Sequence, residues 1–268
     1  MIRRHITLAS VFLLLMTAAG HADEVTCETT TWRVAGGNPL PPAEELNFAL
    51  RWGIITAGAA TLSVHGVEEK AGRPALHVSS YAHSTGVVDT FYKVQDRSDS
   101  WIDAASLTTV RYEKNVREGS YRIQENADFD QKCRRFLQHS VRFDKNNRAE
   151  DRSGRLPPYA LDVFGSLYYM RTLPLAVGQT YTLDVLSGDK IWPLVVNVKR
   201  RETVKVTGGR FDCFVLEPIL RQPGIFVAKG KKVEVWITAD ERRMPVRMRS
   251  EVVIGHVAAE LVNYKRGS

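Results

Sequence analysis

Residues 161–171 read LDVFGSLYYMR and carry the strongest helical pattern in a sequence that otherwise alternates as strands do. Apolar side chains recur there at three- and four-residue intervals, so one face of about three turns is apolar. Asp162 is placed to cap the first turn, Arg171 suits the last turn, and Pro174 ends the helix. One aromatic helix between two strand-rich halves predicts a helix enclosed by a curved sheet.

The rest of the sequence predicts about thirteen strands joined by turn signals at the spacing of an antiparallel meander. Residues 46–52 set the pattern, because large apolar side chains there alternate with polar or small ones. Residues 85–92 suit a short helix or turn. Residues 144–158 are charged and rich in breakers, which predicts a linker, and residues 192–198 and 202–206 predict two separate strands.

A sheet of this length must twist, curl or split rather than stay flat. We therefore expect a mainly β fold, in which a large curved antiparallel meander, a half-barrel or partly open barrel, wraps around one short central helix. Residues 44–268 are expected to form a single β-rich domain. Residues 23–43 are polar and rich in Pro and Gly, which predicts an extended N-terminal arm.

The N-terminus has the pattern of a secretory signal peptide. Arg3 and Arg4 precede a short apolar run that ends in small residues, so residues 1–22 are expected to be cleaved. The apolar run is shorter than the ~20 residues that span a bilayer, and we expect no membrane span in the mature chain. Cleavage removes two arginines and no acids, which lowers the formal charge from +7 to +5. This small excess favours anionic surfaces such as lipid headgroups, and no basic stripe interleaved with aromatics suggests nucleic acid.

Cys27, Cys133 and Cys213 remain in the mature chain. In an oxidising compartment they predict one disulfide and one free thiol, and all three pairings are open. Cys133 and Cys213 lie in strand-like runs and suit buried thiols, whereas Cys27 is placed to hold down the N-terminal arm.

The sequence contains no recognisable catalytic or metal-binding motif, and no cofactor is expected. His65, His77 and His83 lack the spacing of metal ligands, although the last two share one face of a strand. No nucleophile elbow, phosphate-binding loop or dinucleotide fingerprint is present. A hydrolase would need Asp89, Asp96 and a histidine together in one cleft.

Aromatic and apolar side chains are more abundant than a helix on a thin sheet needs. Some of them are expected to line a concave site for a hydrophobic ligand, although core packing is the ordinary role of each one. Residues 222–227 contain an Ile-Phe pair in a loop pattern, which suits a contact site. The candidate ligand-binding residues are Trp52, Phe164, Leu167, Tyr168, Trp192 and Trp236.

The sequence also resembles a known family. The matching segments are residues 46–60, residues 92–96, the helix with Gly178, and residues 235–246. In their order and spacing they are similar to the exported bacterial family called domain of unknown function 3108, from about Leu46 to Tyr264. The resemblance implies a β-rich protein of the Gram-negative periplasm and supplies no established activity, catalytic residue or cofactor. By looser analogy, such a meander is similar to the lipoprotein-carrier half-barrels of the periplasm.

Three hypotheses follow for the function. The leading one is a non-enzymatic periplasmic binder or carrier of a lipid or acyl chain, which predicts a continuous apolar cavity beside Phe164, Leu167 and Tyr168. The second is a cell-envelope structural or assembly factor that contacts another envelope protein through a sheet edge or residues 222–227. It predicts a filled core and an exposed apolar patch. The third is a hydrolase.

Overall fold

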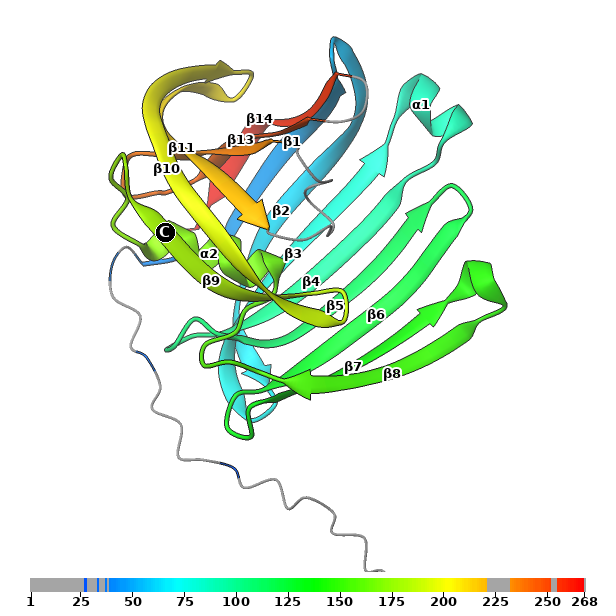
Figure 1. Ribbon diagram of the computed structural model, residues 1–268. Helices are drawn as coiled ribbons and strands as arrows, with labels where there is room; N and C mark the ends of the chain where they lie inside the picture. The colour runs from blue at the N-terminus through cyan, green and yellow to red at the C-terminus, as the bar shows by residue number, and fades with distance from the viewer. Residues whose placement is uncertain are drawn as a thin grey trace, which may run out of the picture.

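The computed structural model describes residues 27, 33, 37, 39–220, 232–251 and 255–267. Residues 1–22, expected to be the signal peptide, and the expected contact loop at 222–227 lie outside this part of the chain. The described residues form one curved antiparallel sheet of fourteen strands and two short α-helices (Figure 1). The mainly β fold expected from the sequence is confirmed.

The chain forms two consecutive meanders. The first comprises β1 (Glu44–Trp52), β2 (Ile55–Lys70), β3 (Arg73–Ser84), α1 (Gly86–Phe91), β4 (Gln95–Asp103), β5 (Thr109–Glu118), β6 (Tyr121–Asp130), β7 (Arg135–Arg142), the 3-10 turn η1 (Phe143–Lys145) and β8 (Arg148–Arg155). The second follows α2 (Val163–Thr172) and comprises β9 (Thr180–Ser187), β10 (Lys190–Val206), β11 (Gly209–Leu220), β12 (Val233–Thr238), β13 (Pro245–Glu251) and β14 (His256–Arg266).

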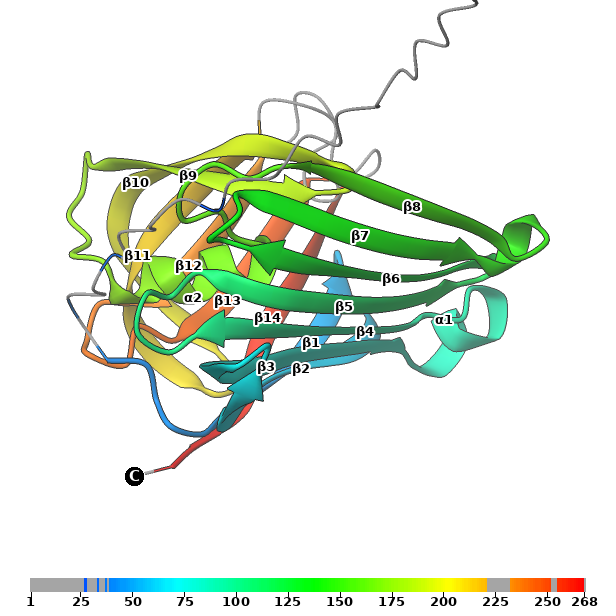
Figure 2. The same cartoon turned by 90° about the horizontal axis from the view of Figure 1, so that it is seen from below.

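The two meanders join through the first and the last strand of the chain, β1 and β14. The spatial order runs from β8 back to β1, continues with β14, and ends at β9. β1 pairs with β14 along its length, so the two ends of the folded chain are hydrogen-bonded neighbours in the middle of the sheet. The sheet is not closed, because β8 and β9 are its two edges (Figure 2).

Helix α2 lies on the concave side of the sheet, between the two meanders (Figures 1 and 2). Its predicted cap is confirmed, because the Asp162 carboxylate accepts hydrogen bonds from the backbone amides of Phe164 and Gly165. Tyr168 packs with apolar residues of β2 to β4, and Met170 packs with those of β9 to β12. The helix therefore joins the cores of both halves.

The last turn of α2 is fixed by a buried ion pair. Arg171 donates two hydrogen bonds of 2.8 Å to the carboxylate of Glu44 on β1. Both side chains are at most 1% exposed, and Arg266 of β14 lies 3.2 Å from the same carboxylate. The helix is thus tied to the strand pair that joins the two meanders.

Two expectations about strands were wrong. Residues 148–155 form the edge strand β8 rather than part of a linker, because edge strands often carry charged side chains on both faces and so lack hydrophobic alternation. Residues 190–206 form the single strand β10, in which a register shift near Lys199 interrupts the alternation without ending the pairing. Both cases concern residues whose burial pattern departs from a regular period of two.

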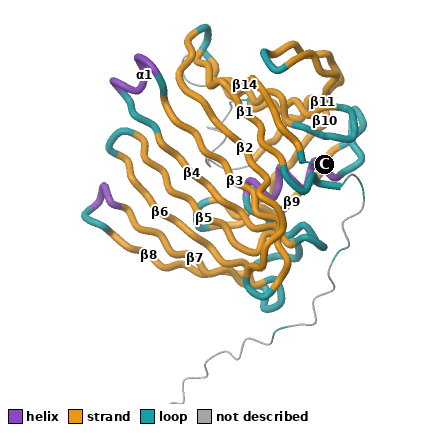
Figure 3. Tube along the Cα trace, turned by 180° about the vertical axis from the view of Figure 1, so that it is seen from behind, coloured by secondary structure: helices purple, strands orange, loops and turns teal. Residues whose placement is uncertain are grey.

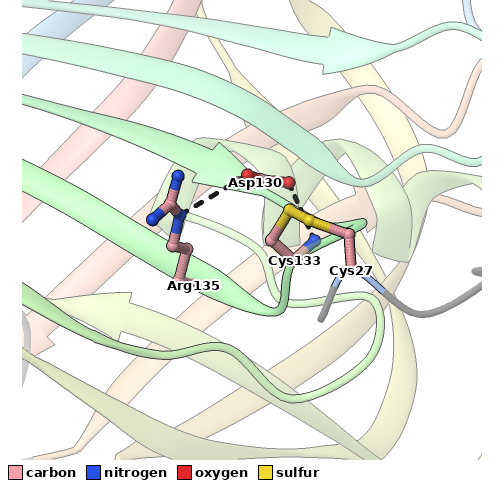
Figure 4. Close-up of a disulfide and its surroundings, with 4 residues drawn as sticks. All are labelled: Cys27, Asp130, Cys133 and Arg135. Carbon is pink, nitrogen blue, oxygen red and sulfur yellow. Dashed lines mark hydrogen bonds and ion pairs between the residues drawn. A yellow bond between two sulfur atoms is a disulfide. The ribbon is translucent and has the colours of Figure 1, made fainter. Parts of the chain in front are cut away.

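The disulfide joins Cys27 of the N-terminal arm to Cys133 in the turn between β6 and β7 (Figure 4). The Asp130 carboxylate supports that turn by accepting a hydrogen bond from the backbone amide of Cys133. Further along the arm, the Arg33 guanidinium lies 3.6 Å from the ring centre of Tyr169 on α2 and donates to the carbonyl of Ser106. The arm is therefore fastened both to the sheet and to α2, and Cys213 is a buried free thiol.

Within the described part of the chain, no helix has the length and apolarity needed to cross a membrane. The same residues contain no group of three or more His, Cys, Asp or Glu side chains that could hold a metal ion.

Candidate functional site

A cavity of about 410 Å³ lies where the N-terminal end of α2 meets β4, β5 and β6. The end of β9 completes its wall through Leu186 and Ser187, together with Gly188 in the turn before β10. We call this space the α2 cavity. It extends along β5 from Tyr112 to Glu118, a length of roughly 20 Å at the usual rise per residue of a strand. Its volume falls within the roughly 300–1,000 Å³ typical of small-molecule sites.

The end of the cavity beside α2 is lined mainly by apolar side chains. Val163 and Phe164 come from the first turn of the helix, and Leu186 comes from β9. Tyr112 lies opposite, packed edge to face against Phe129. Val116 and Ile123, cross-strand partners on β5 and β6, extend the apolar lining away from the helix.

Three polar side chains of the cavity wall, Tyr112, Lys114 and Glu125, interact with one another. The Tyr112 hydroxyl donates to Glu125 at 2.5 Å and accepts from Gln138 at 3.1 Å, and the Lys114 ammonium lies 3.1 Å from Glu125. Burial, and then the negative charge of Glu125, raise the pKa of Tyr112, so its phenol stays protonated at neutral pH. This network forms a neutral patch in the wall.

The far end of the cavity carries a carboxyl pair. Burial, and then the neighbouring Asp96 carboxylate, raise the pKa of Glu118. The Asp96 carboxylate also accepts a hydrogen bond of 3.0 Å from the backbone amide of Arg117. Two carboxyl groups in contact favour retention of a proton between them, so this end of the cavity offers mainly hydrogen-bond acceptors to a ligand.

The N-terminus of α2 is already occupied by a side chain of the chain itself. The Asp162 carboxylate accepts hydrogen bonds from the backbone amides of Phe164 and Gly165. It also accepts hydrogen bonds from the hydroxyls of Ser100 and Thr109, at 2.8 and 2.7 Å. Burial raises the pKa of Asp162, although these four donors act in the opposite direction. Because this carboxyl group fills the positive end of the helix, the cavity has no open anion site there.

The candidate residues of the helix differ in their relation to the cavity. Phe164 lines it directly. Leu167 is half-buried and packs against two apolar clusters, one of which contains residues of both meanders. Tyr168 is 1% exposed in the core, and neither residue lines the cavity. Trp192 lies beside the cavity, since its indole nitrogen donates to the backbone carbonyl of the lining residue Ser187.

The other two candidates lie elsewhere. Trp52 is at the end of β1 and is 46% exposed. Trp236 of β12 is 2% exposed, and its indole nitrogen donates to Glu202 at 2.7 Å. Arg200, Arg247 and Arg249 lie against its ring, so it belongs to a charged and aromatic cluster on the second meander.

The groups that a hydrolase would need are apart. Asp89 on α1 accepts a hydrogen bond from Ser84, whereas Asp96 lines the α2 cavity. None of the described histidines lines that cavity. His77 instead lies within 4.6 Å of His65, ring centre to ring centre, and contacts Asp99 at 2.9 Å.

Sequence reasoning missed most of the cavity lining. Tyr112, Lys114, Val116 and Glu118 share one face of β5 through their even spacing, which the sequence does display. Nothing in the sequence says that this face is concave or that the β9–β10 turn lies over it. The position of α2 decides both.

Comparison with solved structures supports the fold. A beta-barrel-like protein of domain of unknown function DUF1849 from Brucella abortus is 8% identical and covers 86% of this chain and 100% of its own, with a TM-score of 0.56. A Bacteroides fragilis protein with a YmcC-like fold is 9% identical and covers 87% of this chain and 100% of its own, with a TM-score of 0.37. At these identities the first shows a shared fold alone.

Comparison of the sequence gives the family. No protein with a curated description is significantly similar to the chain. The model of the family described as protein of unknown function, DUF3108, matches residues 47–262, which span most of both meanders. The chain therefore belongs to the DUF3108 family.

Proposed function

We propose that this protein is a non-enzymatic carrier that holds an amphiphilic ligand in the α2 cavity. The observation that carries the proposal is the cavity itself, an elongated space of about 410 Å³ with apolar side chains at its helix end. Sites of this kind usually take small molecules with large apolar parts. The apolar chain of the ligand lies beside Val163, Phe164 and Leu186.

The polar end of the ligand lies at the carboxyl pair. Glu118 and Asp96 favour a neutral or positively charged group, because an anion there would meet a second negative charge. The Lys114 ammonium is already paired with Glu125 and offers little compensation. The preferred ligand is thus a lipid or acyl derivative with a neutral or cationic polar end.

The periplasm is the proposed location. The disulfide between Cys27 and Cys133 suits an oxidising compartment, and the first 22 residues have the composition of a cleaved signal. A carrier there would move an apolar molecule through an aqueous space. The separation of Asp89, Asp96 and the histidines supports binding over hydrolysis.

Native mass spectrometry of the protein purified from its own compartment, followed by organic extraction, tests the proposal. We expect one ligand per chain with an apolar tail. Val163→Trp fills the space beside α2 and should abolish the bound mass, and Phe164→Glu should do so independently. Val177→Trp is the matched control, because Val177 is 56% exposed and lies outside the cavity.

Two results would overturn the proposal. One is an unliganded mass with nothing in the extract, from protein that keeps its circular dichroism spectrum. The other is equal ligand loss in Val163→Trp and Val177→Trp. Either result would favour the cell-envelope assembly factor, and crosslinking to an envelope protein would then be the next measurement.

A further inference from the structure

The most exposed apolar side chains of the described chain gather at one end of the sheet. Ile54 is 95% exposed in the β1–β2 turn, and Phe91 is 83% exposed at the end of α1. Ile55 and Tyr92 beside them are about half exposed, at 53% and 50%. Single exposed apolar residues are ordinary, but adjacent ones mark a contact surface.

The two turns that carry these residues are neighbours. The amide of Thr85, just before α1, donates to the carbonyl of Ala57 near the start of β2. Tyr92 lies against Gly119 of the β5–β6 turn, so the next turn continues the same end. Figure 3 shows α1 and these strand turns along one end of the curved sheet.

Basic side chains flank this apolar group. Lys93 follows Tyr92, and Arg117 and Arg122 stand on either side of the β5–β6 turn; all three are exposed. Among the described residues, none of the three forms a salt bridge. Among the acids at this end, Asp144 pairs with Arg142, and Asp89 accepts a hydrogen bond from Ser84. Glu118 and Asp96 form the carboxyl pair at the far end of the cavity. We call Ile54, Ile55, Phe91, Tyr92, Lys93, Arg117 and Arg122 the tip surface.

We propose that the tip surface docks on an anionic lipid bilayer. Apolar and aromatic side chains enter the interfacial layer, while the three bases meet the negative headgroups. Aromatic side chains are favoured at this depth because their rings tolerate both environments. The positive charges of Lys93, Arg117 and Arg122 favour binding to an anionic bilayer over a neutral one.

The α2 cavity reaches the same end of the sheet. Glu118 and Tyr121, which line the cavity, flank the β5–β6 turn between Arg117 and Arg122. Docking would therefore place the far end of the cavity next to the headgroups. The docking proposal does not depend on a ligand in that cavity and is tested separately.

Co-sedimentation of the mature protein with vesicles tests docking. We expect binding to equal parts of phosphatidylglycerol and phosphatidylethanolamine, weaker binding to phosphatidylcholine, and a decline with added salt. Ile54→Asp with Phe91→Asp should weaken binding at least tenfold, because burial of each apolar side chain is lost. Lys93→Gln, Arg117→Gln and Arg122→Gln should cost about fivefold each on the anionic vesicles.

The matched control is Val67→Asp with Val177→Asp, two side chains that are 60% and 56% exposed outside the tip surface. It should bind as the unaltered protein does. Docking is refuted if no vesicle is bound, if the control weakens binding as much as the tip variant, or if phosphatidylcholine binds equally well. Self-association that disappears in the tip variant, without vesicle binding, would assign the surface to a second copy of the chain. Native mass spectrometry of the tip variant distinguishes the two proposals, since its cavity is unaltered.

Discussion

At the scale of single residues, loss of either partner of the buried ion pair between Glu44 and Arg171 should strongly destabilise the fold. Glu44→Gln keeps the shape of the side chain but leaves Arg171 buried without a negative partner. Removal of one member of a buried pair costs about 3–5 kcal/mol of the free energy of unfolding. Urea denaturation followed by circular dichroism measures this loss.

An exposed pair provides the control for that prediction. Asp212 pairs with Arg201 on the surface, and Asp212→Asn should leave the denaturation midpoint almost unchanged. If Glu44→Gln costs no more than Asp212→Asn, the buried pair does not hold α2 to the strands as the structure indicates.

The thiol of Cys213 should be unreactive in the folded protein. Burial, and then the charge of Asp212, raise the pKa of Cys213 to about 12, so almost no thiolate exists at pH 8. A colourimetric thiol assay at this pH should detect none in native protein and one per chain in urea. Reaction before unfolding, or more than one thiol after it, would contradict the burial or the disulfide.

Residue-level interactions show where sequence reasoning reaches its limit. Asp162 was predicted as a helix cap because a cap depends on residues two and three positions ahead. The partner of Arg171 lies 127 residues away, and no local pattern indicates it. Trp236 was expected near a ligand because it is a large aromatic residue, but its surroundings are arginines brought in by β10 and β13.

At the scale of elements, the disulfide should hold the N-terminal arm on the sheet. It joins residues 106 positions apart, and a loop of that size predicts about 3–5 kcal/mol of stabilisation. Cys27→Ser with Cys133→Ser should lower the free energy of unfolding by this amount. Reduction of the unaltered protein should give the same loss, and a difference between the two would mean that the serines themselves disturb the turn.

The strands could be predicted where one face is buried, and not where burial is irregular. β1 alternates because one side faces the core, and the alternation expected over residues 46–52 lies within this strand, which begins two residues earlier at Glu44. β8 has no buried apolar residue, so its sequence lacks the alternation of a half-buried strand. Its charged residues therefore led to the prediction of a linker. The α2 cavity belongs to the same class of unpredictable features, since it depends on which strands α2 leaves uncovered.

At the scale of the whole molecule, the pairing of β1 with β14 makes each meander depend on the other. Neither half can open without exposing the long edge of its partner and the face of α2 that it covers. We therefore predict that residues 44–268 unfold as one cooperative unit, despite containing two meanders.

Hydrogen exchange at increasing urea concentrations can test this cooperativity residue by residue. Core amides of β4 and β5 should exchange with the same opening free energy as those of β11 and β12, because both require global unfolding. The edge strand β8 should exchange at lower free energy, since it is paired on one side only. Two distinct opening energies for the two cores would instead mean that the meanders are separate domains, and that the β1–β14 pairing is an interface rather than part of a common core.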